Sequence, residues 1–379
     1  MIEGAGNDRR PLRFEFTGSG SEYFRIWIVN LLLTLATLGV YSAWAKVRRE
    51  KFFYQHTRLA GTGFDYHGQP SAILRGRILA VALIGLAYAE FLGPVVMICA
   101  WIVLIGLMPW LMQRSMRFRL ANSSYRGLRF AFTGSAAQAY RIFGGYALIA
   151  LLLVGVPMTV ISTGAGPLLA LLVPIGISIL YPLVHASWRQ YVINHARFGN
   201  AEFSGSFLRK PFVGIYFSAL GLWLLIGVIA FVAVAITGSL DALLSRRAAG
   251  DGGPGIFSVI AGVVGGLAAY AIAFAIWPYI TARVQNLCWN LTRVGPHAMS
   301  STLEPFAFVR LQLKNLVLTI VTLGLYRPFA AVATARMRLA ALGLLPAGDI
   351  DEVVAGISAG QQQAVGSEAL DLLGIDFSL

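Results

Sequence analysis

The long apolar runs of this 379-residue chain restrict its fold more than any other feature. A helix needs about 20 residues to cross about 30 Å of hydrocarbon. The second and third runs are too long for one span, and Gly93-Pro94 and Gly166-Pro167 interrupt them, so each is divided into two helices joined by a turn. The runs then supply eight apolar segments and lie near residues 26–44, 78–112, 142–186, 212–236, 256–281 and 311–332.

The composition is typical of an integral membrane protein. Hydrophobic residues make up 57% of the chain and charged residues 12%, and the mean hydropathy is +0.69. These values lie outside the range of soluble globular domains. Two cysteines in the whole chain exclude a disulfide scaffold and a cysteine-rich metal domain.

Lysine and arginine are distributed unevenly between the loops. The loops after the first, third, fifth and seventh segments hold 21 of the 30 basic residues, which predicts that these loops are cytoplasmic. If the first and last segments both span, the termini face outward with seven arginines. If they enter and leave on one side, 28 of the 30 basic residues are cytoplasmic. The charge rule favours the second alternative, six spans plus two re-entrant or interfacial segments, within a range of six to eight transmembrane helices.

Short sequence patterns recur along the chain. Residues 12–19 return at 128–135 with an offset of 116, and residues 56–68 match 122–134 with an offset of 66. A third match joins residues 30–41 to 315–326 at an offset of 285, which indicates that the first and last apolar segments are the same kind of element. Each unit is predicted to contain a helix leaving the membrane, a short strand pair and a helix that re-enters behind an arginine.

Aromatic residues alternate with other residues inside these units, as in Phe14 and Phe16 or Phe64 and Tyr66, and this period is typical of strands. Isolated hairpins are marginal in water, so several small cytoplasmic β-hairpins are expected to associate. The predicted fold class is an all-α polytopic membrane protein with pseudo-repeats and small cytoplasmic β-hairpins. Its membrane domain spans residues 1–340, and residues 341–379, with six acidic residues and no Lys or Arg, form an acidic, largely disordered tail.

Two motifs carry a family resemblance. The first runs from Asn30 through Thr37-Leu38-Gly39 and Tyr41 to Trp44-Ala45, and the second is the Gly-x-x-Phe-x-Tyr-x-Gly pattern of residues 61–68. From about residue 14 to residue 338 the chain resembles the bacterial inner-membrane family of unknown function typified by YjgN. The resemblance implies a multi-pass protein of the bacterial inner (plasma) membrane, and it brings no catalytic residues with it.

Basic and aromatic residues gather where the predicted helices leave the membrane. Such clusters attract anionic lipid at about 1 kcal/mol per Lys or Arg near the surface, although topology alone also requires basic residues in these loops. The arginines at helix entrances suit phosphate because a guanidinium binds it through two parallel hydrogen bonds. The candidate lipid- or anion-binding residues are Arg25, Arg75, Arg141 and Arg310 at the entrances, and Lys46, Arg48, Arg49 and Lys51 in the first loop.

Other chemistry has weaker support in the sequence. Glu90 lies beside the Gly93-Pro94 turn, so a solvated turn residue is favoured over an ion or proton carboxylate. The five histidines show no ligand spacing, and no nucleophile elbow, phosphate-binding loop or His-Glu-x-x-His motif is present in the sequence. We therefore expect no catalytic residue, no metal site, no cofactor and no enzyme activity.

The leading functional hypothesis is binding or translocation of an anionic lipid or amphiphile at the cytoplasmic leaflet. The alternatives are a non-catalytic membrane scaffold or regulator, and a channel or small-solute transporter. Membrane lipids are the expected partners, and a protein partner or a homo-oligomer stays open. Nucleic acid is a poor partner despite the net charge of +13, because membrane orientation explains the basic residues.

Overall fold

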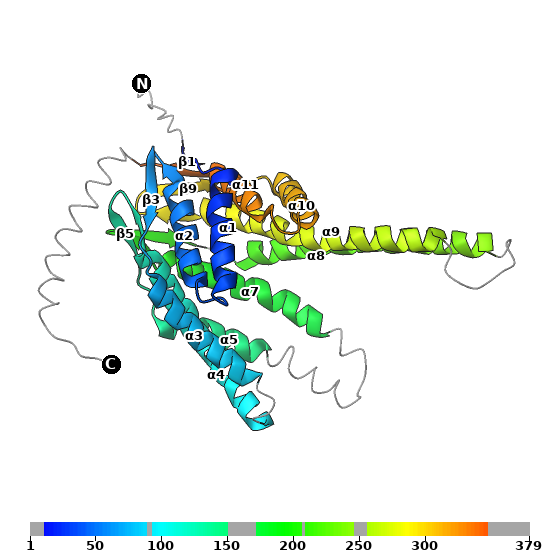
Figure 1. Cartoon of the computed structure of the whole chain (residues 1–379), viewed down its shortest axis with the longest axis horizontal. Helices are drawn as coiled ribbons and strands as arrows, with labels where there is room; N and C mark the ends of the chain where they lie inside the picture. Colours follow the sequence, from blue (N-terminus) through cyan, green and yellow to red (C-terminus); the bar gives the residue numbers. More distant parts are fainter. Residues whose placement is uncertain (1–10, 89–92, 151–171, 207–208, 246–255, 348–379) are drawn as a thin grey trace, which may run out of the picture.

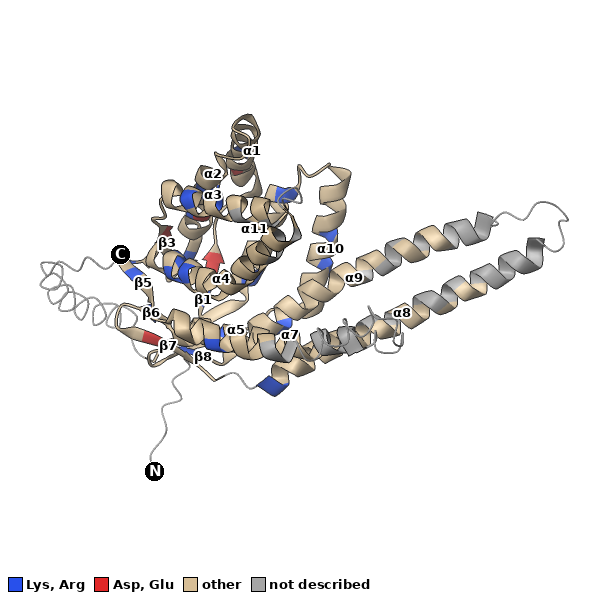
Figure 2. Ribbon diagram, turned by 90° about the horizontal axis from the view of Figure 1, so that it is seen from below, with Lys and Arg blue, Asp and Glu red and all other residues tan. Residues whose placement is uncertain are grey.

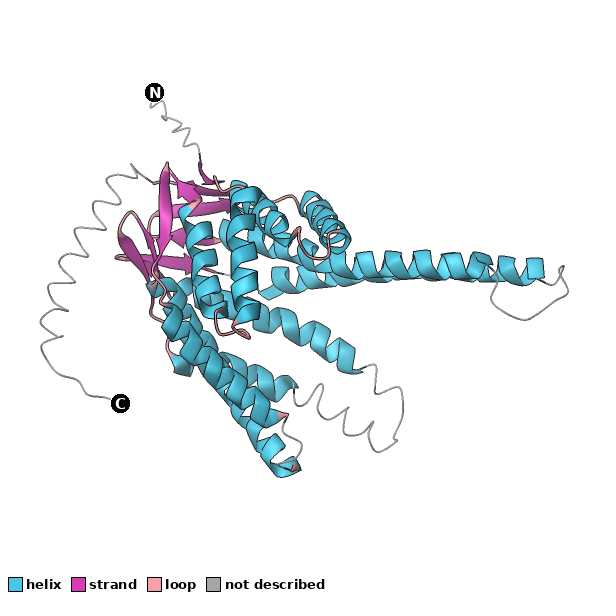
Figure 3. Ribbon diagram, viewed as in Figure 1, coloured by secondary structure: helices cyan, strands magenta, loops and turns pink. Residues whose placement is uncertain are grey.

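The computed structural model describes residues 11–88, 93–150, 172–206, 209–245 and 256–347. Its strands gather at one end of the molecule, and its helices extend away from them (Figures 1 and 3). Glu90, the Gly166-Pro167 turn and the part of the acidic tail from residue 348 onward lie outside the described residues.

Ten antiparallel strands close into one barrel in the order β1-β10-β9-β8-β7-β6-β5-β4-β3-β2. Closure depends on pairing between the two ends of the chain, with Leu12 opposite Leu344 and Arg13 opposite Gly343. The five-residue strands are β1 (Leu12–Phe16), β3 (Thr62–Tyr66), β5 (Leu128–Phe132), β7 (Ala201–Gly205) and β9 (His297–Ser301). The shorter strands are β2 (Thr57–Leu59), β4 (Ser123–Tyr125), β6 (Ala196–Phe198), β8 (Thr292–Val294) and β10 (Leu342–Leu345).

A pair of helices joins the end of each five-residue strand to the start of the next short strand. The pairs are α1 (Gly20–Ala36) with α2 (Ser42–Gln55), α3 (Pro70–Ala87) with α4 (Pro94–Ala121), α5 (Ala136–Ala150) with α7 (Leu172–Asn194), α8 (Arg209–Ser245) with α9 (Ile256–Asn290), and α10 (Pro305–Val321) with α11 (Arg327–Ala340). Because neighbouring strands are antiparallel, all of these helices leave from one rim of the barrel, the helix rim.

Four tight turns close the opposite rim, the turn rim. In the β2–β3 and β4–β5 turns both central residues have positive φ, as a type I′ turn requires: 48° and 77° at Ala60-Gly61, and 50° and 82° at Arg126-Gly127. Glycine supplies this conformation without the steric cost that a Cβ atom brings. These turns match the right-handed twist of the strands and fix the register of each hairpin.

The interior of the barrel is built from rings of apolar side chains. The middle residues of the five-residue strands point inward, four of them phenylalanine and the fifth methionine: Phe14, Phe64, Phe130, Phe203 and Met299. Arginines alternate with the inward residues and lie exposed on the outer face, namely Arg13, Arg58, Arg129, Arg197 and Arg293. An apolar inside and a basic outside show that this barrel presents a water-facing outer surface.

In the first and last helix pairs, α1–α2 and α10–α11, a turn divides the apolar run, so the run does not form one continuous helix. In each pair a threonine hydroxyl donates to the carbonyl one turn earlier and accepts from a backbone N–H beyond the turn: Thr37 Oγ1 contacts Leu33 O at 2.7 Å and Tyr41 N at 2.9 Å. Thr322 makes the equivalent bonds to Leu318 O and Tyr326 N at 2.7 and 3.0 Å. The tips carry Leu38 and Leu323, which are 96% and 94% exposed.

The predicted all-α fold with six to eight spans was wrong. The sequence predicted small hairpins that associate, whereas the strands form one closed barrel, because β1 and β10 join across almost the whole sequence. Within the described residues two helical stretches are long and apolar enough to span a bilayer, Cys99–Ala121 in α4 and Arg209–Ile229 in α8. A turn interrupts each of the runs 26–44 and 311–332, so neither forms one continuous helix. Residues 342–345, just beyond the expected domain boundary, form β10.

We expect the apolar interior to dominate the stability of the barrel. Phe198 is buried in the interior, and its ring centroid lies 4.8 Å from that of Phe130. Phe198→Ala should destabilise the fold by about 3 kcal/mol, because it removes a large buried side chain and leaves a cavity. Arg129→Ala on the outer face should change stability by less than about 0.5 kcal/mol. Thermal unfolding in mild detergent measures both, and equal effects would contradict the assigned inward and outward faces.

Candidate functional site

A basic cavity of about 450 Å³ lies between α1, α2, α3 and α11. Four cationic side chains from three helices line it: Lys46 and Arg49 from α2, Arg77 from α3 and Arg327 from α11. Its other described lining residues include aromatic and amide side chains of α1 but no Asp or Glu. None of the ion pairs in the described part of the chain includes any of these four cations. The cavity is therefore suited to an anion.

One hydrogen bond and one unpaired amide oxygen characterise the polar lining of this cavity. Arg77 donates to the hydroxyl of Ser42, the first residue of α2, so the α3 guanidinium is fixed against the α1–α2 pair. Asn30 is 7% exposed, and its Oδ1 atom makes no hydrogen bond within the described structure. An unsatisfied buried acceptor is costly, so a ligand that carries a hydroxyl group would find a suitable partner there.

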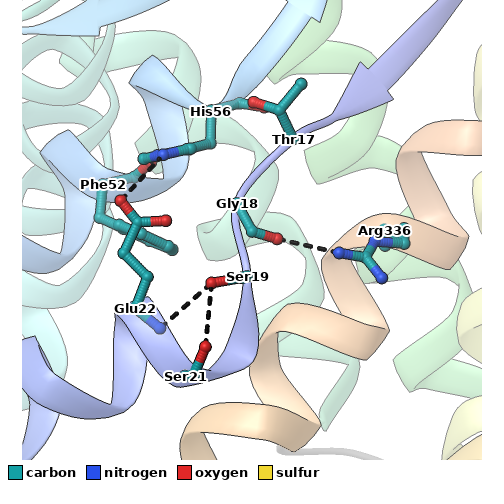
Figure 4. Close-up of polar contacts among 8 residues, drawn as sticks. All are labelled: Thr17, Gly18, Ser19, Ser21, Glu22, Phe52, His56 and Arg336. Carbon is teal, nitrogen blue, oxygen red and sulfur yellow. Dashed lines mark hydrogen bonds and ion pairs between the residues drawn. The ribbon is translucent and has the colours of Figure 1, made fainter.

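The connection between β1 and α1 is held by contacts within α1 and with α11 (Figure 4). Ser19 accepts from the Glu22 backbone N–H at 3.2 Å and so satisfies the first turn of α1. Arg336 of α11 donates to the Gly18 carbonyl at 3.0 Å. A Cβ atom at Gly18 would lie 2.9 Å from the Phe52 ring, so glycine is required where the strand passes α2. We call this junction of β1, α1, α11 and β10 the seam.

A vestibule of about 750 Å³ adjoins the basic cavity and lies at the helix rim, lined mainly by residues of α2, α9, α10 and α11. Arg49 and Ala331 line both spaces. Arg119 of α4 and Arg338 of α11 add two further guanidiniums, and Glu50 supplies the one carboxylate in the described lining. Arg338 Nε donates to Gln285 Oε1 at 2.7 Å, which orients its side chain.

A smaller cavity of about 210 Å³, the lumen, occupies the interior of the barrel. Aromatic and aliphatic side chains line it, together with His297 and with Tyr125, whose hydroxyl donates to the Leu59 carbonyl at 2.8 Å. The His297 Nδ1 atom accepts from the Ala347 N–H at 2.9 Å, and its buried Nε2 atom has no hydrogen-bond partner in the described structure. Burial lowers the pKa of His297, which favours the neutral ring.

A fourth space, of about 600 Å³, lies between α5, α7 and α8. Arg141 of α5 and Arg209 of α8 line it together with Gln138, Tyr146 and Gln190. Arg141 is one of the residues predicted from the sequence.

The structure places the eight predicted residues in two different ways. Arg25, Arg75, Arg141 and Arg310 are each the sixth residue of their helix, in four different helix pairs, and all are exposed. These four therefore occupy equivalent positions but do not form one site. Lys46 and Arg49 line the basic cavity, whereas Arg48 packs over the Tyr41 ring at 5.8 Å and Lys51 is exposed on α2.

Sequence reasoning missed Arg77, Arg119, Arg327 and Arg338. One signal was present for Arg327: the offset of 285 equates it with Ser42, and both are the first residue of a helix after the same turn. Arg119 belongs to the basic, aromatic stretch of residues 114–119, one of the clusters that the sequence does show at the helix exits. Arg77 had no such signal, because its place in the site depends on how separate helix pairs pack around the barrel.

Comparisons with known proteins agree with the resemblance seen in the sequence. The model of a family described as "Bacterial protein of unknown function (DUF898)" matches residues 11–372. The chain belongs to the DUF898 family. The "Inner membrane protein YjgN" of Salmonella typhimurium is 28% identical over 202 residues, which cover 50% of this chain and 51% of that protein. The YjgN protein of Escherichia coli K12 is 29% identical over 126 residues, 32% of this chain and 31% of that protein.

The DUF898 chain thus matches about half the length of the Salmonella relative and about a third of the Escherichia coli relative. No solved structure matches it. The predicted YjgN-like family is confirmed, whereas the site residues predicted from the sequence stay a prediction.

His297 should make the stability of this DUF898 protein depend on pH. Its lowered pKa means that the unfolded chain takes up a proton below about pH 6.5 more readily than the folded chain does. The contribution of neutral His297 to the free energy of unfolding is therefore present above pH 6.5 and is lost as the pH falls below this value. His297→Asn keeps an acceptor for the Ala347 N–H but does not titrate.

Thermal unfolding at pH 7.5 and pH 5.5 measures this effect. We expect a larger fall in the unfolding midpoint for the natural protein than for His297→Asn. The same fall in both proteins would assign the pH dependence to other groups.

Proposed function

We propose that this DUF898 protein binds an anionic lipid or amphiphile at the cytoplasmic leaflet of the bacterial inner membrane, through the basic cavity between α1, α2, α3 and α11. The observation that carries this proposal is the convergence of Lys46, Arg49, Arg77 and Arg327 on one cavity without a carboxylate in its described lining. Arginine binds phosphate through two hydrogen bonds, and lysine adds a point charge.

The distribution of polar and apolar surface supports this location. Charged residues lie mainly on the barrel and on the parts of the helices next to it, whereas residues 211–240 of α8 and 256–282 of α9 include no Asp, Glu, Lys or Arg (Figure 2). The names of the YjgN relatives also support an inner-membrane location. We infer that α4 and α8 enter the bilayer and that the barrel lies in the cytoplasm, because basic regions are retained on that side.

The two short helix pairs suit insertion into one leaflet. Leu38 and Leu323 are almost fully exposed at their tips, and Leu35, Val40, Val321 and Leu325 are exposed around them. A patch of this kind is unusual on a water-facing surface. Interfacial helices bury their apolar side about 5–10 Å into the boundary between headgroups and acyl chains. This depth would bring lipid phosphates to the level of the basic cavity.

The basic cavity should retain anionic lipid through its four cations. The combined variant Lys46→Gln, Arg49→Gln, Arg77→Gln and Arg327→Gln should lose most of the bound anionic lipid, because each Lys or Arg contributes about 1 kcal/mol near a membrane surface. Native mass spectrometry of protein extracted in mild detergent from its own membrane measures the bound lipid.

The matched control replaces four arginines on the outer face of the barrel, Arg13, Arg58, Arg129 and Arg293, by glutamine. It removes the same charge and should retain the lipid. If both variants lose the same amount of anionic lipid, net charge and not the basic cavity explains the binding. If the natural protein carries only the bulk lipids of its membrane, with no enrichment of anionic lipid, the proposal is contradicted. In that event a stoichiometric protein partner would favour the scaffold alternative.

The tips of the first and last helix pairs should lie within the lipid. We expect a bimane label at Leu38→Cys or Leu323→Cys, on a protein with Cys99 and Cys288 replaced by serine, to be quenched by spin-labelled lipids in liposomes. The same label at Arg129→Cys on the barrel should be insensitive to those lipids. Labels at the tips that respond only to aqueous quenchers would show that the tips face water.

A further inference from the structure

The lumen lies inside a ten-stranded barrel, whose interior is wider than side chains alone can fill. Eight strands give an interior that side chains just fill or that holds one small ligand, and the diameter grows with the number of strands. In this ten-stranded barrel the ring of Phe14, Phe64, Phe130, Phe203 and Met299 still leaves a cavity of about 210 Å³. The interior therefore has room for a slender apolar group.

The chemistry of the lumen excludes water and charge. Apart from His297 its described lining residues are aromatic, aliphatic or sulfur-containing, and an apolar cavity of this kind stays dry and accepts an apolar ligand. The hydrogen bond from Ala347 occupies Nδ1 of His297. His297 lies at the start of β9, next to the turn rim, so the rest of the lumen toward the helices is apolar.

The open end of the lumen meets the vestibule. Phe14, Phe64, Trp289 and Met299 line both spaces. On the vestibule side stand Arg49, Arg119 and Arg338 against the single carboxylate of Glu50, and none of these arginines takes part in an ion pair of the described residues. The lining of these two connected spaces thus changes from cationic in the vestibule to apolar inside the barrel.

We propose that the vestibule and lumen together bind a single-chain anionic amphiphile, with its carboxylate or phosphate at Arg119 and Arg338 and its alkyl chain inside the barrel. This inference rests on the proposed function and specifies the class of ligand. The narrow lumen accepts one chain, whereas a lipid with two acyl chains would have to leave its second chain among the charged groups of the vestibule.

Arg49 connects the two sites. Its side chain lines both the basic cavity and the vestibule, so an anionic headgroup that arrives between the helix pairs already contacts a residue of the inner site. Fatty acids and lysophospholipids share the required chemistry of one chain and one anionic head. The two sources are separated by using one probe of each type.

Photocrosslinking of the full chain in mild detergent tests the site directly. The probes are a fatty acid and a lysophosphatidylglycerol, each with a diazirine at the end of its chain. We expect adducts on the lumen residues of β6, β7 and β9, in the tryptic peptides that contain Phe198, Phe203 and Met299. Adducts confined to helices α3–α9 would overturn the proposal. Labelling by one probe alone identifies which head the vestibule accepts.

A matched pair of variants shows whether the chain occupies the barrel. Ala201 lines the lumen, and Ala131 lies exposed on the outer face of β5. Ala201→Phe should abolish the strand adducts, whereas Ala131→Phe should leave them unchanged. Ala201→Leu is a milder filling that should lower labelling and protects the test against misfolding of the phenylalanine variant. Strand adducts that persist in a folded Ala201→Phe protein would overturn the proposal.

Chain length gives a second measurement. Within the lumen each additional methylene should raise the affinity about fourfold until the cavity is filled, after which the affinity should level off. An affinity that rises without limit would indicate partition into detergent. Retention of two-chain anionic lipid by the Ala201→Phe protein separates this proposal from the proposed function, because the basic cavity is intact in that variant.

Discussion

Closure of the barrel between β1 and β10 is the constraint on which the rest of the molecule depends. Once the two ends of the chain pair, every strand has two neighbours and the barrel has no free edge to aggregate. Antiparallel closure also sends every helix pair out from the same rim. The basic cavity, the vestibule and the lumen all follow from this arrangement, since each is enclosed by residues from helix pairs or strands that are distant in the sequence.

Local features of the fold were predictable, whereas closure was not. The alternating aromatic residues do lie in strands, because Phe14 and Phe64 occupy the middles of β1 and β3. Strand β10, Leu-Gly-Leu-Leu, shows no alternation and begins beyond the last predicted helix, so the sequence offered no partner for β1. The turn at Thr37 was hidden for a different reason. Its exposed residues are apolar, and one threonine hydroxyl satisfies the backbone groups that polar turn residues usually satisfy.

The candidate site divides in the same way. Lys46 and Arg49 belong to a basic cluster that any charge count detects, and both line the basic cavity. Arg77, two residues after Arg75, and the isolated Arg327 join them only because α3 and α11 pack against the first helix pair. Arg25, Arg75, Arg141 and Arg310 show the limit of a repeat argument. Equivalent positions in a ring of similar units are separated around the barrel, so residues that match one another in sequence do not meet.

Because the basic cavity lies between the first and last helix pairs, an anion bound in it would affect how tightly these pairs pack. Lys46 and Arg49 come from the first helix pair and Arg327 from α11, the helix whose Arg336 donates to the Gly18 carbonyl. Four cations with no carboxylate in the described lining repel one another, and this repulsion opposes the approach of α11 to α2. An anion in the cavity replaces repulsion by attraction and stabilises the folded chain by RT ln(1 + c/Kd), which grows with the logarithm of the anion concentration c. Binding at this site therefore strengthens the same junction that closes the barrel.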